Sequence, residues 1–342
     1  MTHPDKITSA EVARHAGVSQ SAVSRVFTPG ASASPEMTER VRQAADELGY
    51  RPNILARSLI TGRSRIIGLV ISYFENNFYP EALEKLSRAL QERGYHVLVF
   101  MAQQSAENIE DVVQEILDYQ VDGIVAASVA MSSDLATRCR AAGVPVVLFN
   151  RVQDDGRLSA VESDNLGGGT ALAEFLVAGG HQRIGYIAGW ESASTQRDRE
   201  AGFLAGLHAA GLSLHARQVG NFRHDEAAEA ARKMFTGPDR PDAVFVANDH
   251  MAFAVMDVLR FELGLRIPED VSVVGYDDVP MASWPSYNLT TIRQSAEAMV
   301  AKTVEILMQH IEEDDATPRR TRVDAPLIVR GSARVLKQDE AK

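Results

Sequence analysis

The sequence of 342 residues contains one cysteine, Cys139, and aromatic residues make up only 6% of it. A single thiol excludes an intrachain disulfide and a metal cluster held by several thiolates. No apolar run approaches the roughly 20 residues that cross a bilayer, and the first residues, MTHPDKITSAEV, lack the apolar core of a secretory signal. We therefore expect a reduced, cytoplasmic protein of two or three folded units.

Positive charge is scarce overall, since the formal net charge is −11, but it is unevenly spread. Residues 1–62 hold seven basic and six acidic side chains, a net charge of +1, whereas the remaining chain holds 28 basic and 40 acidic ones, a net charge of −12. The acidic body is a poor partner for a DNA backbone. Only the amino-terminal segment is therefore expected to contact DNA.

The amino-terminal segment carries the start and stop signals of three short helices. Thr8 and Glu11 predict a capping box, and Ser19 is a good N-cap for a second helix after a very short turn. A third helix is expected to begin after Ser34, with Pro35 at its first position. This spacing predicts a helix-turn-helix, whose second helix enters the major groove. A small helical bundle without DNA contact is the alternative.

The predicted second helix has one apolar and one polar face. Helical periodicity turns Val23 and Val26 inward and leaves Gln20, Ser21, Ser24 and Arg25 facing solvent. These four side chains can hydrogen-bond to base edges.

The segments ITSAEVARHAGVSQSAVSRVF and SPEMTERVRQAADELGYRPNILARSL resemble the lactose and galactose repressor family. The resemblance implies that Gln20, Ser21 and Arg25 read bases, while the hydroxyls of Ser19 and Ser24 contact phosphates. The sequence departs from the family pattern at Ala22, where a phosphate-binding threonine is usual, and at Thr28-Pro29. Fewer phosphate contacts are therefore expected.

The stretch NILARSLI, residues 53–60, resembles the hinge helix of the same family. The resemblance implies DNA contacts from Asn53, Ala56 and Leu59, with Leu59 as the wedge that unstacks a minor-groove step and bends the duplex. Eight residues form a marginal helix in water, so order there should depend on partners. The alternative is a simple tether that ends at Gly62.

From Ser64 onward, short apolar runs alternate with amphipathic helices. The predicted strands are RIIGLVI, HVLVFMA, GIVAAS and VPVVLFN, and the pattern restarts after Asn165 with RIGYIAG, AVFVAND and VSVVGYD. This alternation predicts two similar α/β lobes with parallel sheets. Ligands of such sheets bind beyond the carboxyl ends of the strands.

Short polar side chains follow several predicted strands, namely Asn150, Asn248-Asp249 and Asp277-Asp278. Carboxylates and amides that face one cleft, beside aromatic surfaces such as Phe78 and Phe222, suit a polyhydroxylated ligand such as a sugar. The alternative is that these residues are ordinary turn and helix-cap residues.

Arg197 and Arg199 lie in the segment STQRDREAGF. A guanidinium fork there matches a pair of hydroxyls, a carboxylate or a phosphate.

The family resemblance extends through the body, in VESDNLGGGTALAEFLVAGGHQRIGYIAG, ARKMFTGPDRPDAVFVANDHMAFAVMDVL, IPEDVSVVGYDD and NLTTIRQ. It implies a two-lobed effector domain of the type I periplasmic-binding-protein-like class. The effector-binding residues that it implies are Phe78, Tyr79, Asn150, Arg197, Arg199, Phe222, Asn248 and Asp277. The usual Asn-Pro before the two aromatic residues is Asn76-Asn77 here.

The expected architecture is multidomain, with an all-α helix-turn-helix head and an α/β two-lobed body. Its parts are the head at 1–52, the hinge helix and linker at 53–63, and the effector-binding and dimerisation domain at 64–342, with lobe 1 at about 64–162 and 292–324 and lobe 2 at about 163–291 and 325–342. The last residues, ARVLKQDEAK, show no heptad run. A homodimer that reads a pseudo-palindromic operator is therefore expected.

The predicted function is a sequence-specific transcriptional regulator, a repressor, whose operator affinity is controlled by a sugar or sugar derivative bound between the lobes. No cofactor, metal or catalytic residue is expected. An enzyme is the first rival, but Gly167-Gly168-Gly169 lacks the spacing of a phosphate loop, and His181 with Asp277 lacks an accompanying nucleophile. A transport-type sugar-binding protein is the second rival, and it would not need residues 1–62. The sequence leaves open whether the ligand loosens or strengthens DNA binding.

Overall fold

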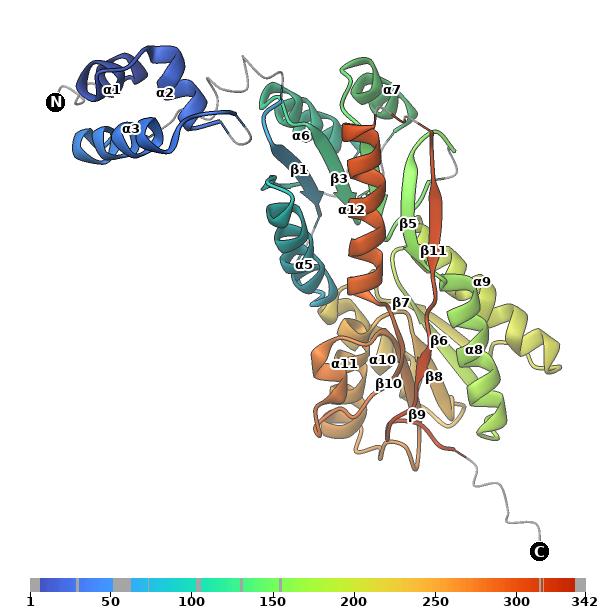
Figure 1. Ribbon diagram of the computed structural model, residues 1–342. Helices are drawn as coiled ribbons and strands as arrows, with labels where there is room; N and C mark the ends of the chain where they lie inside the picture. The colour runs from blue at the N-terminus through green and yellow to red at the C-terminus, as the bar shows by residue number, and fades with distance from the viewer. Residues whose placement is uncertain are drawn as a thin grey trace, which may run out of the picture. The chain divides into compact units, whose positions relative to one another are not determined.

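The computed structural model divides into two units, residues 1–64 and 65–342 (Figure 1). It describes residues 7–28, 31–51, 63–72, 74–102, 106–129, 132–153, 156–313, 315 and 317–335. Across these ranges, no helix combines the length and the apolar composition that a membrane crossing requires.

The described residues of the first unit form three helices: α1 (Ser9–Ala16), α2 (Gln20–Val26) and α3 (Pro35–Leu48). The capping box of Thr8 and Glu11 is present, and Ser19 and Ser34 cap the next two helices as predicted. Gly17 and Gly49 end the first and third helices at φ of 66° and 67°, a conformation that glycine adopts without strain.

A small apolar core holds these three helices together. Val12, Val23 and Val41 are fully buried, one from each helix, and Ala13, Ala44 and Ala45 fill the space between them. The helix-turn-helix predicted from the sequence is therefore confirmed as a packed unit.

Lobe 1 of the second unit is built on a six-stranded parallel sheet. Its strands, in the order β11-β5-β4-β3-β1-β2, are β11 (Arg320–Val323), β5 (Ser159–Ser163), β4 (Val146–Phe149), β3 (Gly123–Ala127), β1 (Ile66–Ile71) and β2 (His96–Met101). Helices α5 (Phe78–Glu92) and α12 (Ala296–Glu312) pack together on one face, and α6 (Ala106–Asp118) and α7 (Ser133–Ala141) on the other.

Lobe 2 repeats the plan. Its strands, in the order β12-β10-β9-β8-β6-β7, are β12 (Leu327–Ile328), β10 (Thr290–Arg293), β9 (Ser272–Asp277), β8 (Ala243–Val246), β6 (Ile184–Ala188) and β7 (Ala216–Val219), and only β12 is antiparallel. Its helices are α8 (Asn165–Ala178), α9 (Ser194–Ala209), α10 (His224–Phe235) and α11 (Asp249–Asp257), followed by the π-helix Val258–Glu262 and the 3-10 helix Pro280–Ser283. The predicted pair of parallel α/β lobes is confirmed.

The chain crosses between the lobes three times, after β5, after β10 and after β11. We expected these crossings near residues 162, 291 and 324. Arg320–Val323, at the end of the polar stretch that follows α12, form β11, because they pair in parallel with β5. Strands β5, β7 and β10 also lay outside the sequence prediction, since each is short and half of β7 is charged or polar.

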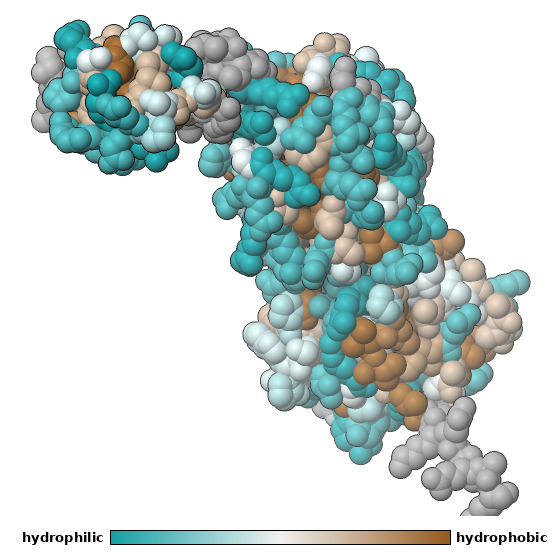
Figure 2. All heavy atoms as spheres, viewed as in Figure 1, coloured by the Kyte–Doolittle hydropathy of each residue, from teal (hydrophilic) through white to brown (hydrophobic). Residues whose placement is uncertain are grey.

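The surface of the visible face is mostly hydrophilic, and apolar side chains gather chiefly over the second lobe (Figure 2). Large apolar residues with more than half of their surface exposed include Phe261, Trp284 and Met101. Exposed apolar area of this kind marks interaction surfaces.

We predict that Cys139 resists thiol reagents in the folded protein. It lies in α7 with no exposed surface, and burial raises the pKa of its thiol to about 11. Because the thiolate is the reactive form, a colorimetric thiol assay at about pH 8 should label the native protein very slowly. One thiol per chain should react in concentrated guanidinium chloride, and rapid labelling of the native protein would contradict the buried position.

Candidate functional site

The predicted DNA-reading face of α2 is present. Gln20, Ser21, Ser24 and Arg25 are exposed, whereas Val23 is fully buried. The amide of Gln20 donates to the Ser9 hydroxyl at 2.9 Å, which holds that side chain near the start of α1. The head therefore presents the side chains that a major-groove contact needs, and their roles on DNA stay predictions.

Ser19 caps α2 by accepting a hydrogen bond from the Ala22 amide, and its hydroxyl also contacts that of Ser21 at 2.9 Å. Ala22 is buried in the core of the head, so the departure from the family threonine leaves a methyl group that faces inward. The predicted hinge residues Asn53, Ala56 and Leu59 lie outside the described residues.

Polar side chains from both lobes meet where the carboxyl ends of the two sheets approach each other. Their centre is Asp277, the last residue of β9, which is 2% exposed. Its carboxylate accepts from the amide of Asn76 in lobe 1 at 2.7 Å and from the amide of Gln294 at 2.6 Å. Asp277 thus joins the two lobes directly.

Arg199 of α9 supplies the positive charge beside Asp277. Its guanidinium donates to Asn165 at 2.9 Å and to the carbonyl of Ala247 at 2.6 Å, and it lies 3.4 Å from the Asp277 carboxylate. The guanidinium carbon also stands 3.7 Å from the centre of the Tyr276 ring. Every part of this buried side chain therefore has a partner, which fixes its position.

Two carboxyl groups share this buried region. Burial raises the pKa of Asp277, while the charge of Arg199 opposes that rise. Burial also raises the pKa of Asp249 well above its usual range, and the charge of Asp277 adds to the effect. Asp249 accepts hydrogen bonds from the Thr291 hydroxyl at 2.6 Å and from the Val279 amide at 3.0 Å. These bonds connect α11 with β10 and with the segment that follows Asp277.

Several polar atoms in the same region are buried without a hydrogen-bond partner. They are Oδ1 of Asn150, Nε of Arg151, Nδ2 of Asn248 and Oε1 of Gln294. Each of these residues follows or ends a strand at its carboxyl edge. Buried polar atoms are nearly always paired in folded proteins, so a group of unpaired ones makes this region a candidate ligand-binding site.

We call the buried polar residues of this region the inter-lobe cluster, which consists of Asn76, Asn150, Arg151, Arg199, Asn248, Asp277 and Gln294. A cavity of about 160 Å³ adjoins the cluster and is lined by Phe78, Asp277 and Gln294 among others. The structure therefore brings together most of the effector residues predicted from the sequence.

The predicted aromatic residues lie on both sides of the cluster. Phe78 and Tyr79 are buried, and Phe78 stacks on Phe149 with ring centres 6.1 Å apart. Phe222 of lobe 2 lies against the backbone of Gly189, where a Cβ atom would come within 2.2 Å of the ring. Only glycine at that position permits the ring to lie so close.

Backbone strain concentrates at the same edge. Among the described residues other than glycine, nine have positive φ, and six of these follow or end strands there: Ser128, Asn150, Asn221, Phe222, Asp277 and Asp278. A positive φ is unusual for a bulky residue such as Phe222. Such strain is typical of functional sites, where the surrounding structure holds residues in place.

Arg197 is the exception among the predicted effector residues, since its side chain is exposed on α9. Sequence reasoning missed Asn76, Arg151 and Gln294 as members of the cluster, and it also missed Trp190 beside Arg151. Arg151 follows Asn150 directly after β4, so a search extended by one residue past each strand end would have found it.

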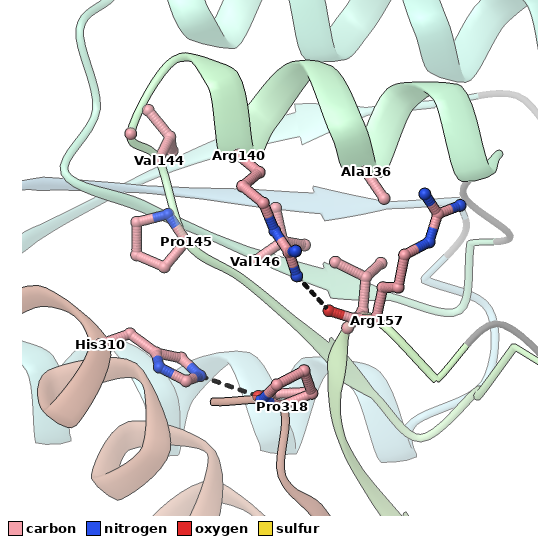
Figure 3. Close-up of a pocket in the computed structure, with 11 residues that line it drawn as sticks. Ala136, Arg140, Val144, Pro145, Val146, Arg157, His310 and Pro318 are labelled. Carbon is pink, nitrogen blue, oxygen red and sulfur yellow. Dashed lines mark hydrogen bonds between the residues drawn. The ribbon is translucent and has the colours of Figure 1, made fainter. Parts of the chain in front are cut away.

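A second hollow of about 200 Å³ lies at the opposite, amino-terminal edge of the lobe 1 sheet (Figure 3). There Arg140 points from α7 and donates to the carbonyl of Arg157 at 3.0 Å, and His310 of α12 contacts the Ser159 hydroxyl at 2.8 Å. Parallel α/β sheets bind ligands at the carboxyl edge, so this hollow is separate from the inter-lobe cluster.

The features that suggested catalysis do not meet in the structure. His181 contacts Asp242 at 3.1 Å and Arg334 at 2.8 Å near the start of β6, whereas Asp277 ends β9. Asp164 caps α8, in which Gly167, Gly168 and Gly169 pack closely against neighbouring side chains and backbone. In the described part of the chain, no three His, Cys, Asp or Glu side chains group in a way that could hold a metal ion.

A helix-turn-helix head and a two-lobed body with buried polar groups between its lobes define a ligand-responsive DNA-binding regulator. Comparison with known proteins agrees: the model of bacterial regulatory proteins of the lacI family matches residues 8–53, and that of the periplasmic binding protein-like domain matches residues 173–333. The ribose operon repressor of Escherichia coli is 31% identical over 331 residues, which cover 95% of this chain and 99% of that protein. The transcriptional regulator CelR of Thermobifida fusca is 34% identical, with 94% and 96% covered.

Solved structures give the same result. The lac repressor dimer bound to operator and the anti-inducer ONPF matches with a TM-score of 0.86 and 29% identity, covering 96% of this chain and 99% of that one. The CelR–cellobiose complex matches with a TM-score of 0.73 and 32% identity over 96% of this chain and all of that one. The chain belongs to the lacI family of bacterial regulatory proteins, and it is a transcriptional regulator rather than an enzyme.

We predict that Arg199→Met destabilises the body by about 3 to 5 kcal/mol near neutral pH, because it leaves the Asp277 carboxylate buried without its cation. Without Arg199, the pKa of Asp277 in the folded state rises further above the unfolded value of about 3.9. The folded state then holds a proton that the unfolded state releases, so stability should increase as the pH falls.

Urea unfolding of this variant at about pH 7.5 and about pH 5.5 measures both effects. The double variant Arg199→Met with Asp277→Asn is the control, and it should recover part of the loss and lose the added pH dependence. A single variant as stable as the parent at both pH values would show that the pair does not hold the region together.

Proposed function

We propose that this regulator is a cytoplasmic repressor that binds a pseudo-palindromic operator as a homodimer and responds to a sugar or sugar derivative held by the inter-lobe cluster. The observation that carries the proposal is the set of unpaired buried atoms on Asn150, Arg151, Asn248 and Gln294, in a chain whose other unit is a helix-turn-helix. Buried donors and acceptors of this kind are matched by the hydroxyl groups of a sugar.

The names of relatives support the ligand class. The ribose operon repressor, the CelR–cellobiose complex and the lac repressor complex are three matches across nearly the whole chain. Transcriptional repressors named PurR also match at similar identity, for example 31% for that of Vibrio vulnificus. A sugar derivative, with hydroxyls for the amides and a face for Phe222 and Trp190, fits the polar and aromatic composition of the cluster better than a purely apolar ligand does.

Exposed apolar residues support the dimer. Strand β2 forms the edge of the lobe 1 sheet, where Val99 and Met101 are 43% and 51% exposed. In lobe 2, Phe261 and Trp284 are 81% and 51% exposed. An exposed apolar edge strand invites pairing with another chain, and a second copy would cover both areas.

On DNA, we assign base contacts to Gln20, Ser21 and Arg25, and phosphate contacts to Ser19 and Ser24. All five are exposed on or just before one helix, which suits a helix that lies in the major groove. Asn53, Ala56 and Leu59 are assigned to the hinge contacts by the family resemblance alone. Release or capture of the operator would follow from ligand-dependent contacts between the lobes.

The test begins with selection of binding sites from a random duplex pool, followed by measurement of operator affinity with and without pentoses, hexoses and disaccharides. A recovered palindrome whose affinity changes with one sugar supports the proposal. Failure to recover any preferred site, with each sugar present and absent, would overturn it.

We predict that Arg25→Ala weakens operator binding by about 1 to 3 kcal/mol and changes binding to random DNA little, because a bidentate contact to a base distinguishes sequences. Fluorescence anisotropy with the selected site and a scrambled site measures both. Arg42→Ala on the exposed side of α3 removes the same charge and is the matched control. Equal losses on both DNAs would reassign Arg25 to phosphate contact.

We predict that Asn248→Ser weakens the binding of the responsive sugar by roughly tenfold, which corresponds to about 1.4 kcal/mol. Serine retains the cap of α11, which Asn248 now provides to the Met251 amide at 3.0 Å, but it removes the unpaired amide donor. Isothermal titration measures the affinity. Operator binding without the sugar and the thermal midpoint serve as controls, and both should stay close to those of the parent.

A further inference from the structure

Arg151 is a buried cation in lobe 1 whose neighbours among the described residues are a carbonyl group and two aromatic rings. It follows β4 in lobe 1 and is 4% exposed. Its NH1 group donates to the carbonyl of Ser128 at 2.9 Å, and its Nε atom is buried without a partner. Among the described residues, no carboxylate forms an ion pair with it.

The aromatic neighbours of Arg151 do not replace an anion. The guanidinium carbon lies 5.4 Å from the centre of the Trp190 ring and 5.7 Å from that of Phe222, both from lobe 2. These distances are near the outer limit of cation–π attraction. A ring face also accepts no strong hydrogen bond from Nε, so the burial of this charge stays largely uncompensated.

The other buried arginine of the cluster shows the contrast. Arg199 has Asn165, the Ala247 carbonyl and the Asp277 carboxylate as partners. The charge of Asp277 is thus already balanced by Arg199. Asp249, which is not part of the cluster, is engaged by the Thr291 hydroxyl and the Val279 amide. The inter-lobe cluster is left with an excess positive charge, at Arg151, inside a body whose net charge is strongly negative.

We propose that the effector is an anionic sugar derivative, with a carboxylate or phosphate group that binds the Nε edge of Arg151. This inference rests on the proposed effector site and specifies its ligand class. The Nε and NH2 groups of an arginine form a planar edge that matches two oxygens of a carboxylate or phosphate. The unpaired Oδ1 of Asn150, Nδ2 of Asn248 and Oε1 of Gln294 then contact the hydroxyl groups of the same molecule.

The geometry also gives the anion a role in the response. Arg151 belongs to lobe 1, and its ring neighbours Trp190 and Phe222 belong to lobe 2. Close by, the Val152 amide donates to the Ser194 hydroxyl across the lobe boundary at 3.0 Å. An anion on Arg151 therefore binds at a point where the two lobes already touch, so its binding free energy depends on their separation.

The experiment compares each anionic sugar with its neutral parent on the full-length protein. The pairs are gluconate and glucose, galacturonate and galactose, ribonate and ribose, and ribose 5-phosphate and ribose, with inorganic phosphate as a further ligand. Isothermal titration gives affinity, and operator anisotropy gives the response. We expect at least one anionic member to bind at least about tenfold more tightly than its parent. The sugar acids and the sugar phosphates distinguish a carboxylate from a phosphate.

Arg151→Gln should remove this preference, lowering the affinity of the anionic ligand by about tenfold or more and leaving that of the neutral parent unchanged. Arg151→Lys keeps the charge without the planar fork and should retain part of the affinity. Arg183 is an exposed arginine just before β6 in lobe 2, away from the cluster. The variant Arg183→Gln removes one positive charge there and is the matched control. Thermal midpoints show that each variant is folded.

The outcomes separate the two proposals. Neutral sugars that bind and change operator affinity as well as or better than their anionic partners would overturn the anionic ligand and uphold the effector site. An anionic preference that survives Arg151→Gln would also overturn the role of Arg151. If no ligand of either kind changes operator affinity, the effector site itself is wrong, and this inference is wrong with it.

Discussion

Asp277 is a carboxylate buried at the boundary between two lobes, and the arrangement around it follows from the need to supply it with donors. Asn76 reaches it from lobe 1, Gln294 from the segment that returns to lobe 1, and Arg199 from α9 of lobe 2. A buried charge that lost these partners would be costly. The contact between the lobes is therefore polar and specific, and a ligand that competes for these donors changes how the lobes meet.

The parallel sheets explain why such a site forms at this place. Each strand ends at the same edge of its sheet, so residues far apart in the sequence, such as Asn150 and Asn248, come to one region. The chain turns sharply there, with positive φ at Asp277 and Phe222. The packed helices on both faces hold these turns in place, and strained residues persist only where the surroundings determine them.

The head and the body differ in net charge, and this difference assigns DNA contact to the head. The head has a small positive excess and an exposed polar helix face, while the body carries the negative charge of the chain. A large acidic body disfavours nonspecific contact with DNA, so the reading of DNA is confined to the head. Arg151 is the exception inside the body, because this buried cation forms no ion pair with a carboxylate of the described residues, and the proposed anionic ligand would balance its charge.

The local features of this protein follow from its sequence alone. Caps at Thr8, Ser19 and Ser34 set the head helices, and alternating apolar runs set the two α/β lobes, because hydrogen bonds near helix ends and burial of apolar faces act over a few residues. Asn150, Asn248 and Asp277 were also predicted as ligand-binding residues, because they follow or end predicted strands. Which polar groups pair depends instead on the folded arrangement of the two lobes. Short strands such as β10 and β11 depend on neighbours distant in the chain for their hydrogen bonds. The pairing of Asn76 with Asp277 and the unpaired Nε atom of Arg151 likewise depend on how the two lobes meet, which no local pattern encodes.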